Sequence, residues 1–379
     1  MRMKHKDILL LVNVTATDDV YPTIIHYAKE HGWRLTIEDR LAPPEGWRGD
    51  GAIVEAMDIP IIARYLRSLR HKGISVVNLT DSRIARCIPS CIIDTGLVSR
   101  LASEHFCERG FTHAAFFSME WVHGRKMQFA SFAKAWGKAY VSKWIWPEAT
   151  KARNINNHAA MVKWIKGVIA AAPKPIAVFC VNSYNAVTLL NICLDMGLSV
   201  PEEIAILSAQ YDPAFCDCQT VPISGVEIDS RQHAMEAAAM LDGIIERRND
   251  IPNHILIKPK GIKIQQSTNV LASENPMIRQ AFRFIRENLS HPFGAAEVAA
   301  YLAIPRIRLD RLFASELKRS VGSEILRQRI SNVKRMLAES DAKIDLIAAE
   351  TGFCHASYLI KAFKKTEGVT PHKFRSGLT

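Results

Sequence analysis

Hydrophobic positions in the first 270 residues alternate between short continuous runs and longer stretches with helical spacing. The runs lie at 8–14, 75–79, 114–118, 176–181 and 204–208. Helical spacing occurs at 21–31, 59–71, 97–109 and 185–196, each followed shortly by a glycine. Buried strands separated by helices of about 10–15 residues predict βαβ units with parallel sheets. One sheet would be long for so many units, so we expect an α/β, two-lobed, doubly wound domain.

Beyond Pro276 the pattern becomes helical and contains a duplication. The predicted helices are 277–289, 295–302, 306–313, 323–337, 343–350 and 355–365. Two pairs of short helices are joined by tight turns, the first at Ala303 and the second at Gly352, which suits the positive φ of such a turn. Short helices joined by a turn of about three or four residues form a helix-turn-helix unit. The sequence therefore predicts an all-α domain with two such units.

The net charge of +11 is concentrated in the same region. Residues 277–379 hold 18 Lys and Arg against 10 Asp and Glu, whereas residues 1–276 hold 31 against 28. Such a block attracts polyanions, because each neutralised phosphate releases condensed counterions. A solvated basic face is the alternative, and only the helix-turn-helix pattern favours DNA over it.

Several function classes are excluded by what the chain lacks. The eight cysteines are scattered without the paired spacing of a zinc site, so we expect reduced, structural thiols in a cytoplasmic protein. The longest apolar runs are about six residues, far below the ~18 of a membrane span. Dinucleotide, P-loop, nucleophile-elbow and HExxH motifs are absent from the sequence. We expect no enzyme activity, no cofactor, no metal and no membrane partner.

The last hundred residues carry a specific set of motifs. They are Ile347-Ala348, Gly352-Phe353, Ser357-Tyr358-Leu359, Phe363-Lys364-Lys365, Gly368-Val369-Thr370-Pro371 and Phe374-Arg375. With them, residues 277–379 resemble the AraC-type DNA-binding domain. The resemblance implies two recognition helices in successive major grooves, roughly 34 Å apart. Leu359 departs from the usual Phe, and Ile360 and Lys361 replace a small polar residue and an arginine.

The resemblance also assigns roles to exposed residues of the two recognition helices. In the first, Arg311 could donate twice to guanine, Asp310 could accept from cytosine, and Ile307 could touch a thymine methyl. The corresponding base-edge positions of the second are Ala356, Ser357, Ile360 and Lys361. The expected phosphate anchors are Arg306, Arg308, Lys364 and Lys365. For each of these residues a solvated surface position is the alternative.

The first part of the chain carries motifs of a different kind. They are Asn182-Ser183-Tyr184-Asn185-Ala186, Val200-Pro201-Glu202-Glu203-Ile204 and Asp212-Pro213, after the apolar run at 176–181. This part resembles the sensor of LacI-type repressors and periplasmic binding proteins. A sensor followed by an AraC-type reader is the arrangement of the bacterial xylose-operon regulator family, which the chain resembles as a whole.

In such sensors an arginine, an asparagine and an aspartate bind sugar hydroxyls. The resemblance places Arg125 and Asn182 at the first two positions, whereas Gln210 occupies the aspartate position and Ser183 replaces a second Asp. Neutral groups still bond hydroxyls, but less strongly than charged ones. Further candidates are Trp121, which could stack on a pyranose or belong to the core, and Asp94, Asn13 and Thr15 at strand ends.

These inferences predict a sensor over 1–268, a linker over 269–276 and a DNA-binding domain over 277–379. The polar stretch from Gln265 to Glu274 marks the boundary. We expect a cytoplasmic, homodimeric transcription regulator, an activator of sugar-catabolism genes, controlled by a small sugar such as xylose. Its expected partners are double-stranded DNA, the sugar and RNA polymerase. The alternative is a sugar-binding or metabolic module whose helical tail contacts other proteins.

Overall fold

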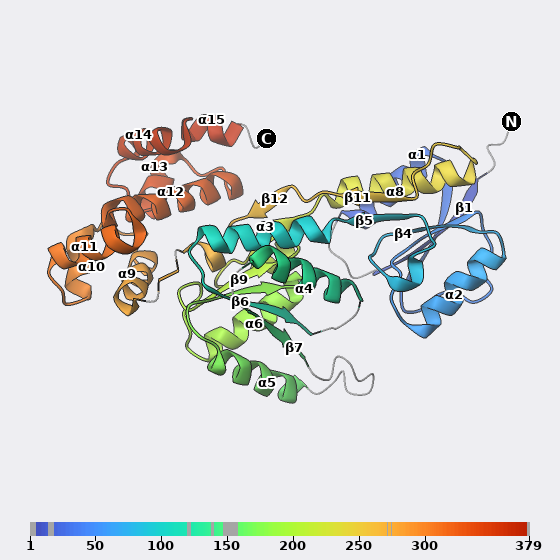
Figure 1. Cartoon of the computed structure of the whole chain (residues 1–379). Helices are drawn as coiled ribbons and strands as arrows, with labels where there is room; N and C mark the ends of the chain where they lie inside the picture. Colours follow the sequence, from blue (N-terminus) through green and yellow to red (C-terminus); the bar gives the residue numbers. More distant parts are fainter. Residues whose placement is uncertain are drawn as a thin grey trace. The chain divides into compact units, whose positions relative to one another are not determined.

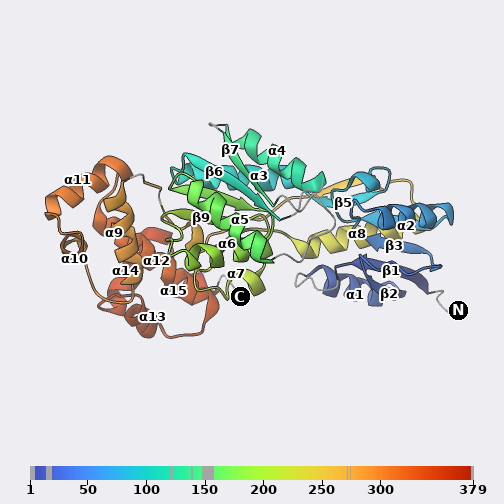
Figure 2. The same cartoon turned by 90° about the horizontal axis from the view of Figure 1, so that it is seen from below.

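The chain forms two compact units, Met1–Asn269 and Val270–Thr379, which we call the amino-terminal unit and the helical unit. The computed structural model describes residues 5–13, 19–119, 123–137, 140–146, 158–270, 272–273 and 275–376. Figures 1 and 2 show the chain from two sides, coloured along the sequence. Among the helices of these described ranges, none is long and apolar enough to cross a membrane.

The first lobe of the amino-terminal unit is a six-stranded sheet in the order β11-β5-β4-β3-β1-β2. Its strands are β1 (Lys6–Val12), β2 (Trp33–Asp39), β3 (Gly51–Val54), β4 (Ser75–Asn78), β5 (Ser90–Ile93) and β11 (His254–Ile257). Neighbouring strands are parallel. The helices covering this sheet are α1 (Val20–Glu30) and α8 (Ser230–Ile245) on one face and α2 (Pro60–His71) on the other.

Burial on both faces explains why the strands of this lobe are continuously apolar. Along β1, Ile8 and Leu10 pack with α1 and α8, whereas Leu9 and Leu11 pack with α2. Successive side chains of a strand point to opposite faces, so a strand covered on both sides needs an apolar residue at every position.

The second lobe is another six-stranded sheet, in the order β12-β10-β9-β8-β6-β7. Its strands are β6 (His113–Ser118), β7 (Val141–Ile145), β8 (Ile176–Cys180), β9 (Ile204–Ser208), β10 (Ser224–Glu227) and β12 (Gly261–Lys263). The pair β10–β12 is antiparallel and the other neighbours are parallel. The principal helices of the lobe are α3 (Thr95–Glu108), α4 (His123–Trp136), α5 (His158–Ala171) and α6 (Ser183–Asp195).

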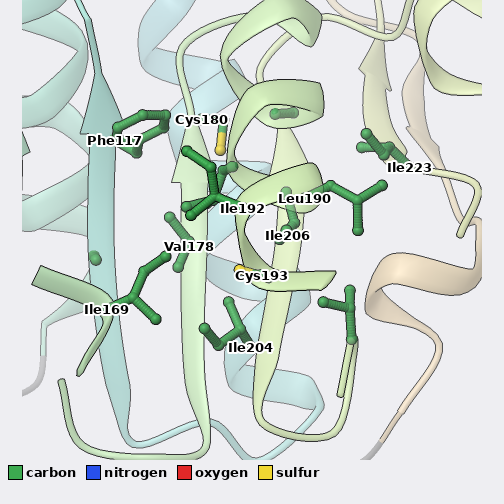
Figure 3. Packing of buried hydrophobic residues seen from close by; sticks show 14 of the residues in the cluster. Phe117, Ile169, Val178, Cys180, Leu190, Ile192, Cys193, Ile204, Ile206 and Ile223 are labelled. Carbon is green, nitrogen blue, oxygen red and sulfur yellow. The ribbon is translucent and has the colours of Figure 1, made fainter. Parts of the chain in front are cut away.

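The second sheet is also buried on both faces. Phe179 of β8 packs against Phe132 of α4, with ring centroids 4.9 Å apart. On the opposite face, Val178 and its neighbours pack against α5 and α6, as Figure 3 shows for Ile169 and Leu190. The chain passes between the lobes at 94, 228–229 and 258–260. The predicted two-lobed, doubly wound class is thus confirmed.

The helical unit consists of seven described helices. They are α9 (Pro276–Glu287), α10 (Ala295–Tyr301), α11 (Arg306–Leu317), α12 (Val321–Glu339), α13 (Ile344–Glu350), α14 (Ala356–Glu367) and α15 (Pro371–Ser376). We call α10–α11 the first helix-turn-helix unit and α13–α14 the second. The predicted all-α domain with two such units is confirmed, although α11 extends beyond its predicted end and α15 was not predicted.

The duplication includes the helix that precedes each unit. Buried residues of α9 and the loop after it have counterparts on α12, 48 positions later in the sequence. The pairs are Phe282 and Ile330, Ile285 and Val333, and Leu289 and Leu337. The helical unit is therefore two similar three-helix bundles in tandem, α9–α11 and α12–α14, followed by α15.

Candidate functional site

The turn that precedes each recognition helix contains a residue with a positive φ in both helix-turn-helix units. Ala303 has a φ of 52° and Gly352 a φ of 71°. Both angles lie in the left-handed region, in which glycine alone is unstrained. Helix α11 then begins after Pro305 and α14 after His355. The positive φ predicted for Gly352 is confirmed, and Ala303 adopts it despite its side chain.

One face of α11 is anchored in the core and the other is exposed. Leu309 and Phe313 are fully buried, and the ring centroid of Phe313 lies 6.0 Å from that of Phe282 on α9. The residues expected to contact DNA lie away from this anchor. Arg306, Ile307, Arg308 and Arg311 are exposed, and Asp310 is half-exposed. The 67% exposure of Ile307 is high for an isoleucine and leaves its side chain available to a partner.

Two of these residues form an ion pair with each other. Arg306 Nε lies 3.6 Å from a carboxylate oxygen of Asp310, one helical turn away, and both side chains are largely exposed. An exposed pair of this kind contributes little to stability. Either partner can therefore exchange the pair for a contact with DNA at small cost.

Helix α14 has the same anchored face but a different exposed one. Leu359 and Phe363 are buried, and Ala356 packs partly into the same cluster. The other expected DNA contacts, Ser357, Ile360, Lys361, Lys364 and Lys365, are exposed. Tyr358 is 55% exposed between two of them and has no role in the sequence assignment. An aromatic residue at an exposed position of a recognition helix is the feature of the sequence that could have identified Tyr358 as a further candidate.

The expected sugar-binding residues of the second lobe lie at the carboxyl ends of adjacent strands. Asn182 follows β8 and caps α6, because its side-chain oxygen accepts from the backbone N of Asn185 at 2.8 Å and from Asn185 Nδ2 at 2.7 Å. The side-chain oxygen of Asn185 accepts in turn from the backbone N of Met119, at 2.8 Å, just after β6. The side-chain oxygen of Asn182 is thus occupied by two hydrogen bonds from Asn185, whereas its amide NH2 group supplies donors.

Ser183 and Gln210 are brought together by the main chain. The hydroxyl groups of Ser183 and Ser208 each donate to the backbone carbonyl of Gln210, at 2.6 Å in both cases. Ser183 is buried, whereas Gln210 is half-buried. The hydroxyl of Ser183 is therefore committed to holding the loop after β9, and the Gln210 side chain is the group that this loop presents.

Arg125 lies where the two lobes approach each other. It is half-buried in the first turn of α4. A Cβ on the adjacent Gly124 would lie 3.1 Å from the carbonyl oxygen of Asp81, in the loop after β4 of the first lobe. Parallel sheets bind ligands at the carboxyl ends of their strands. Arg125 therefore stands at this edge of the second sheet, next to a loop of the first lobe.

The remaining candidates are less closely grouped. Asp94 caps α3 by accepting from the backbone N of Leu97 at 2.8 Å. Asn13 follows β1, and its backbone N donates to Glu55 at 3.2 Å. Their strands, β5 and β1, are separated in the sheet by β4 and β3. Trp121 and Thr15 lie outside the described residues.

The last residues of the amino-terminal unit are held by a buried polar network. The Thr268 hydroxyl donates to that of Ser224 at 2.7 Å, and its oxygen therefore accepts from His105 Nε2 at 2.8 Å. Arg109 Nε donates to the carbonyl of Thr268 at 2.9 Å. Burial lowers the pKa of His105 to about 3, so the imidazole is neutral at physiological pH. The start of the polar stretch is thus part of the folded lobe.

Two known domain families match this chain. The periplasmic binding protein-like domain matches residues 103–268, and the helix-turn-helix domain matches residues 298–377.

Curated relatives match both parts together. The xylose operon regulatory protein of Haemophilus influenzae is 23% identical, over 76% of this chain and 74% of its own length. The protein of the same name from Escherichia coli K12 is 22% identical over 99% of this chain and 98% of its own. The arabinose operon regulatory protein of that strain is 27% identical over 44% of this chain and 53% of its own. These relatives are transcription regulators rather than enzymes.

Solved structures share the fold. The xylose-binding transcription activator xylR superposes with a TM-score of 0.74 at 20% identity, covering 99% of both chains. A LacI family transcriptional regulator from Mycobacterium smegmatis superposes with a TM-score of 0.57 at 19% identity, over 70% of this chain and all of its own.

Proposed function

Since the chain belongs to the xylose-operon regulator family and is a DNA-binding transcription regulator with a sugar-sensing domain, we propose that its effector is a small neutral sugar, with xylose the first candidate. The names of two relatives and of one structural neighbour support this choice. The effector is proposed to bind at the carboxyl ends of the strands in the amino-terminal unit.

The observation that carries this proposal is the group formed by Arg125, Asn182 and Gln210. Asn182 and Gln210 follow the adjacent strands β8 and β9, and Arg125 follows β6 on the other side of β8. Together they supply guanidinium and amide groups, which match the donors and acceptors of sugar hydroxyls. Gln210, in the position of an aspartate, makes the site less acidic, which suits an uncharged polyol. Ser183 holds the Gln210 loop, and Asp94 and Asn13 are secondary candidates.

The test is ligand binding by the full chain. A ligand that binds only the folded state raises the melting temperature, so a thermal-shift panel of pentoses, hexoses and polyols should identify the effector. Calorimetry with that sugar should show a loss of affinity for Arg125→Ala and for Asn182→Asp. The second change keeps the capping oxygen of α6 and removes the NH2 donors. Lys126→Ala, an exposed neighbour on α4, is the control and should bind normally.

On the DNA, α11 and α14 are proposed to enter successive major grooves. Ile307, Asp310 and Arg311 would face base edges from α11. The proposed base-edge residues of α14 are Ala356, Ser357, Ile360 and Lys361, and the phosphate anchors of both helices are Arg306, Arg308, Lys364 and Lys365. Nine of these eleven residues are exposed, and Asp310 and Ala356 are half-exposed, which supports this assignment.

The regulator is further proposed to act in the cytoplasm as a homodimer that activates transcription through contact with RNA polymerase. Closed two-fold association is the commonest assembly of soluble proteins. Sedimentation at equilibrium should give twice the chain mass. Operator DNA should change sugar affinity by the same factor by which sugar changes operator affinity, because the coupling is reciprocal. Equal sugar affinity with and without operator would contradict coupling at the level of binding.

A further inference from the structure

One residue of α12 contacts the loop that opens the first helix-turn-helix unit. Arg329 Nη2 donates to the carbonyl oxygen of His291 at 2.8 Å and to that of Phe293 at 3.4 Å. The guanidinium carbon also lies 5.0 Å from the centroid of the Phe293 ring. His291 and Phe293 belong to the loop between α9 and α10, so Arg329 ties α12 to the segment from which α10 starts.

The same guanidinium reaches the turn of the second unit. It lies 6.0 Å from the centroid of the Phe353 ring. A Cβ on Gly352 would lie 3.1 Å from Arg329 Nε, and 2.4 and 2.7 Å from the carbonyl oxygens of Leu289 and His291. The turn of the second unit is therefore in direct backbone contact with the loop of the first. Arg329, half-buried, lies where α12, the loop and the turn meet.

We infer that Arg329 is a positioning residue that sets which spacing between the two DNA half-sites the chain accepts. The inference rests on the DNA-reading function of α11 and α14. Helix α10 begins two residues after Phe293, and α14 begins three residues after Phe353. We call the contact of Arg329 with these two segments the joint. Because it fixes both segments, few residues with free backbone rotation lie between the joint and either helix-turn-helix unit.

DNA geometry makes this joint consequential. Half-sites in successive grooves are about 34 Å apart over 10–10.5 base pairs, so one added pair moves a half-site by ~3.4 Å and turns it by ~35°. A rigid joint cannot follow that change. A planar guanidinium can bond two carbonyls and stack on two rings, whereas the compact ammonium of lysine cannot do all of this.

The experiment compares three duplexes with the full chain. The first is a site selected from randomised duplex DNA by the wild-type chain, and the others have one base pair inserted or removed between the two protected half-sites. Wild type is expected to lose about tenfold or more in affinity on either altered duplex. Arg329→Lys keeps the charge but loosens the joint. This variant is expected to bind either altered duplex with an affinity less than about threefold below its own affinity for the selected site.

Two further variants separate spacing from other effects. Lys365→Ala removes one exposed charge from α14 and should lower affinity for all three duplexes by the same factor. Phe293→Leu keeps apolar volume and removes one ring from beside the guanidinium, so it should relax the spacing preference without changing charge. Folded Arg329→Lys and Phe293→Leu chains that retain the wild-type spacing penalty would overturn the inference. A selection that enriched no sequence would overturn the DNA-reading function itself, and this inference with it.

Discussion

The two helix-turn-helix units have the same backbone course but hold it with different residues. The turn before the recognition helix is left-handed at Ala303 in the first unit and at Gly352 in the second. The residue that ends the recognition helix is left-handed as well, at Lys318 and at Gly368. Because an L side chain costs about 1–2 kcal/mol in this region, the first unit carries strain that the second avoids.

Space decides which of the four positions must be glycine. A Cβ at Gly352 would overlap the carbonyl oxygens of Leu289 and His291, whereas one at Gly368 would meet no described atom within 4 Å. Ala303 is exposed. The duplicated conformation is thus a requirement of the fold at all four sites, but the absence of a side chain is a packing requirement at Gly352 alone.

The reading faces differ as well. The proposed base-edge positions of α11 hold Asp310 and Arg311, which can form charged hydrogen bonds with bases. Those of α14 hold Ala356, Ser357 and Ile360 with a single lysine, so most of that face offers contact area and few hydrogen bonds. We therefore expect α11 to discriminate between bases more sharply than α14.

The largest effect is expected at the packed turn. Gly352→Ala should destabilise the helical unit by about 3–5 kcal/mol, because it combines an unfavourable φ with backbone overlap. All seven tryptophans lie in the amino-terminal unit. In urea unfolding, tryptophan fluorescence therefore reports the amino-terminal unit alone. A loss of helical circular dichroism at urea concentrations that leave the fluorescence unchanged measures unfolding of the helical unit. Gly368→Ala, which adds only the conformational cost, is the matched control and should lose about 1 kcal/mol.

The reading faces are compared by alanine substitution. Arg311→Ala should weaken binding to the selected site by ~1–3 kcal/mol and leave binding to random DNA nearly unchanged. Lys364→Ala should weaken binding to the selected site and to random DNA by the same factor. It should also reduce the slope of log affinity against log salt concentration by about one, the contribution of one phosphate contact. Fluorescence anisotropy on both duplexes at several salt concentrations measures the base-specific and the phosphate contributions to affinity. An equal loss on both duplexes for Arg311→Ala would make it a phosphate contact.

Relief of strain in the first unit gives a smaller effect of opposite sign. Ala303→Gly and Lys318→Gly should each stabilise the helical unit by roughly 1 kcal/mol, less the entropy that glycine gains on unfolding. The same unfolding experiment measures the gain. Destabilisation by either change would show that these side chains contribute contacts worth more than the strain.

The smallest effect concerns the exposed ion pair on α11. Asp310→Asn should change the free energy of unfolding by less than about 0.5 kcal/mol, because the pair with Arg306 is exposed. Its base preference should change even so, since an amide can donate as well as accept. Selection from randomised DNA with this variant checks the preference, and an unchanged site would exclude Asp310 from base contact.

Much of the fold follows from hydrophobic periodicity. The strand at 204–208 has the predicted bounds, because it is a short apolar run bounded by clear breaks. Strand β7 was missed since its Lys143 interrupts the apolar pattern at the edge of the sheet, and α15 was missed since it is only six residues long. The exposed face of α11 was predictable, because helical spacing fixes which residues lie opposite Leu309 and Phe313.

The details of the sugar site were not predictable in the same way. Nothing in the sequence indicates that the hydroxyl of Ser183 bonds the Gln210 carbonyl, because that contact depends on the packing of two separate loops. The polar residues after Gln265 look like a solvated connection, yet Ser267 and Thr268 are fully buried. Polar composition alone cannot distinguish a solvated segment from a buried hydrogen-bonded one.

The central claim, that both units read DNA and that α11 reads it more sharply, is tested most directly by substituting every base pair of the selected site in turn. Affinity measured for each substituted duplex should fall in two clusters about 10 base pairs apart. In wild type, one cluster should show larger losses of affinity than the other. With Arg311→Ala, base-pair substitutions in that cluster should cost less affinity than they cost wild type. A single cluster, or two in which Arg311→Ala reduces only the weaker losses, would contradict the account.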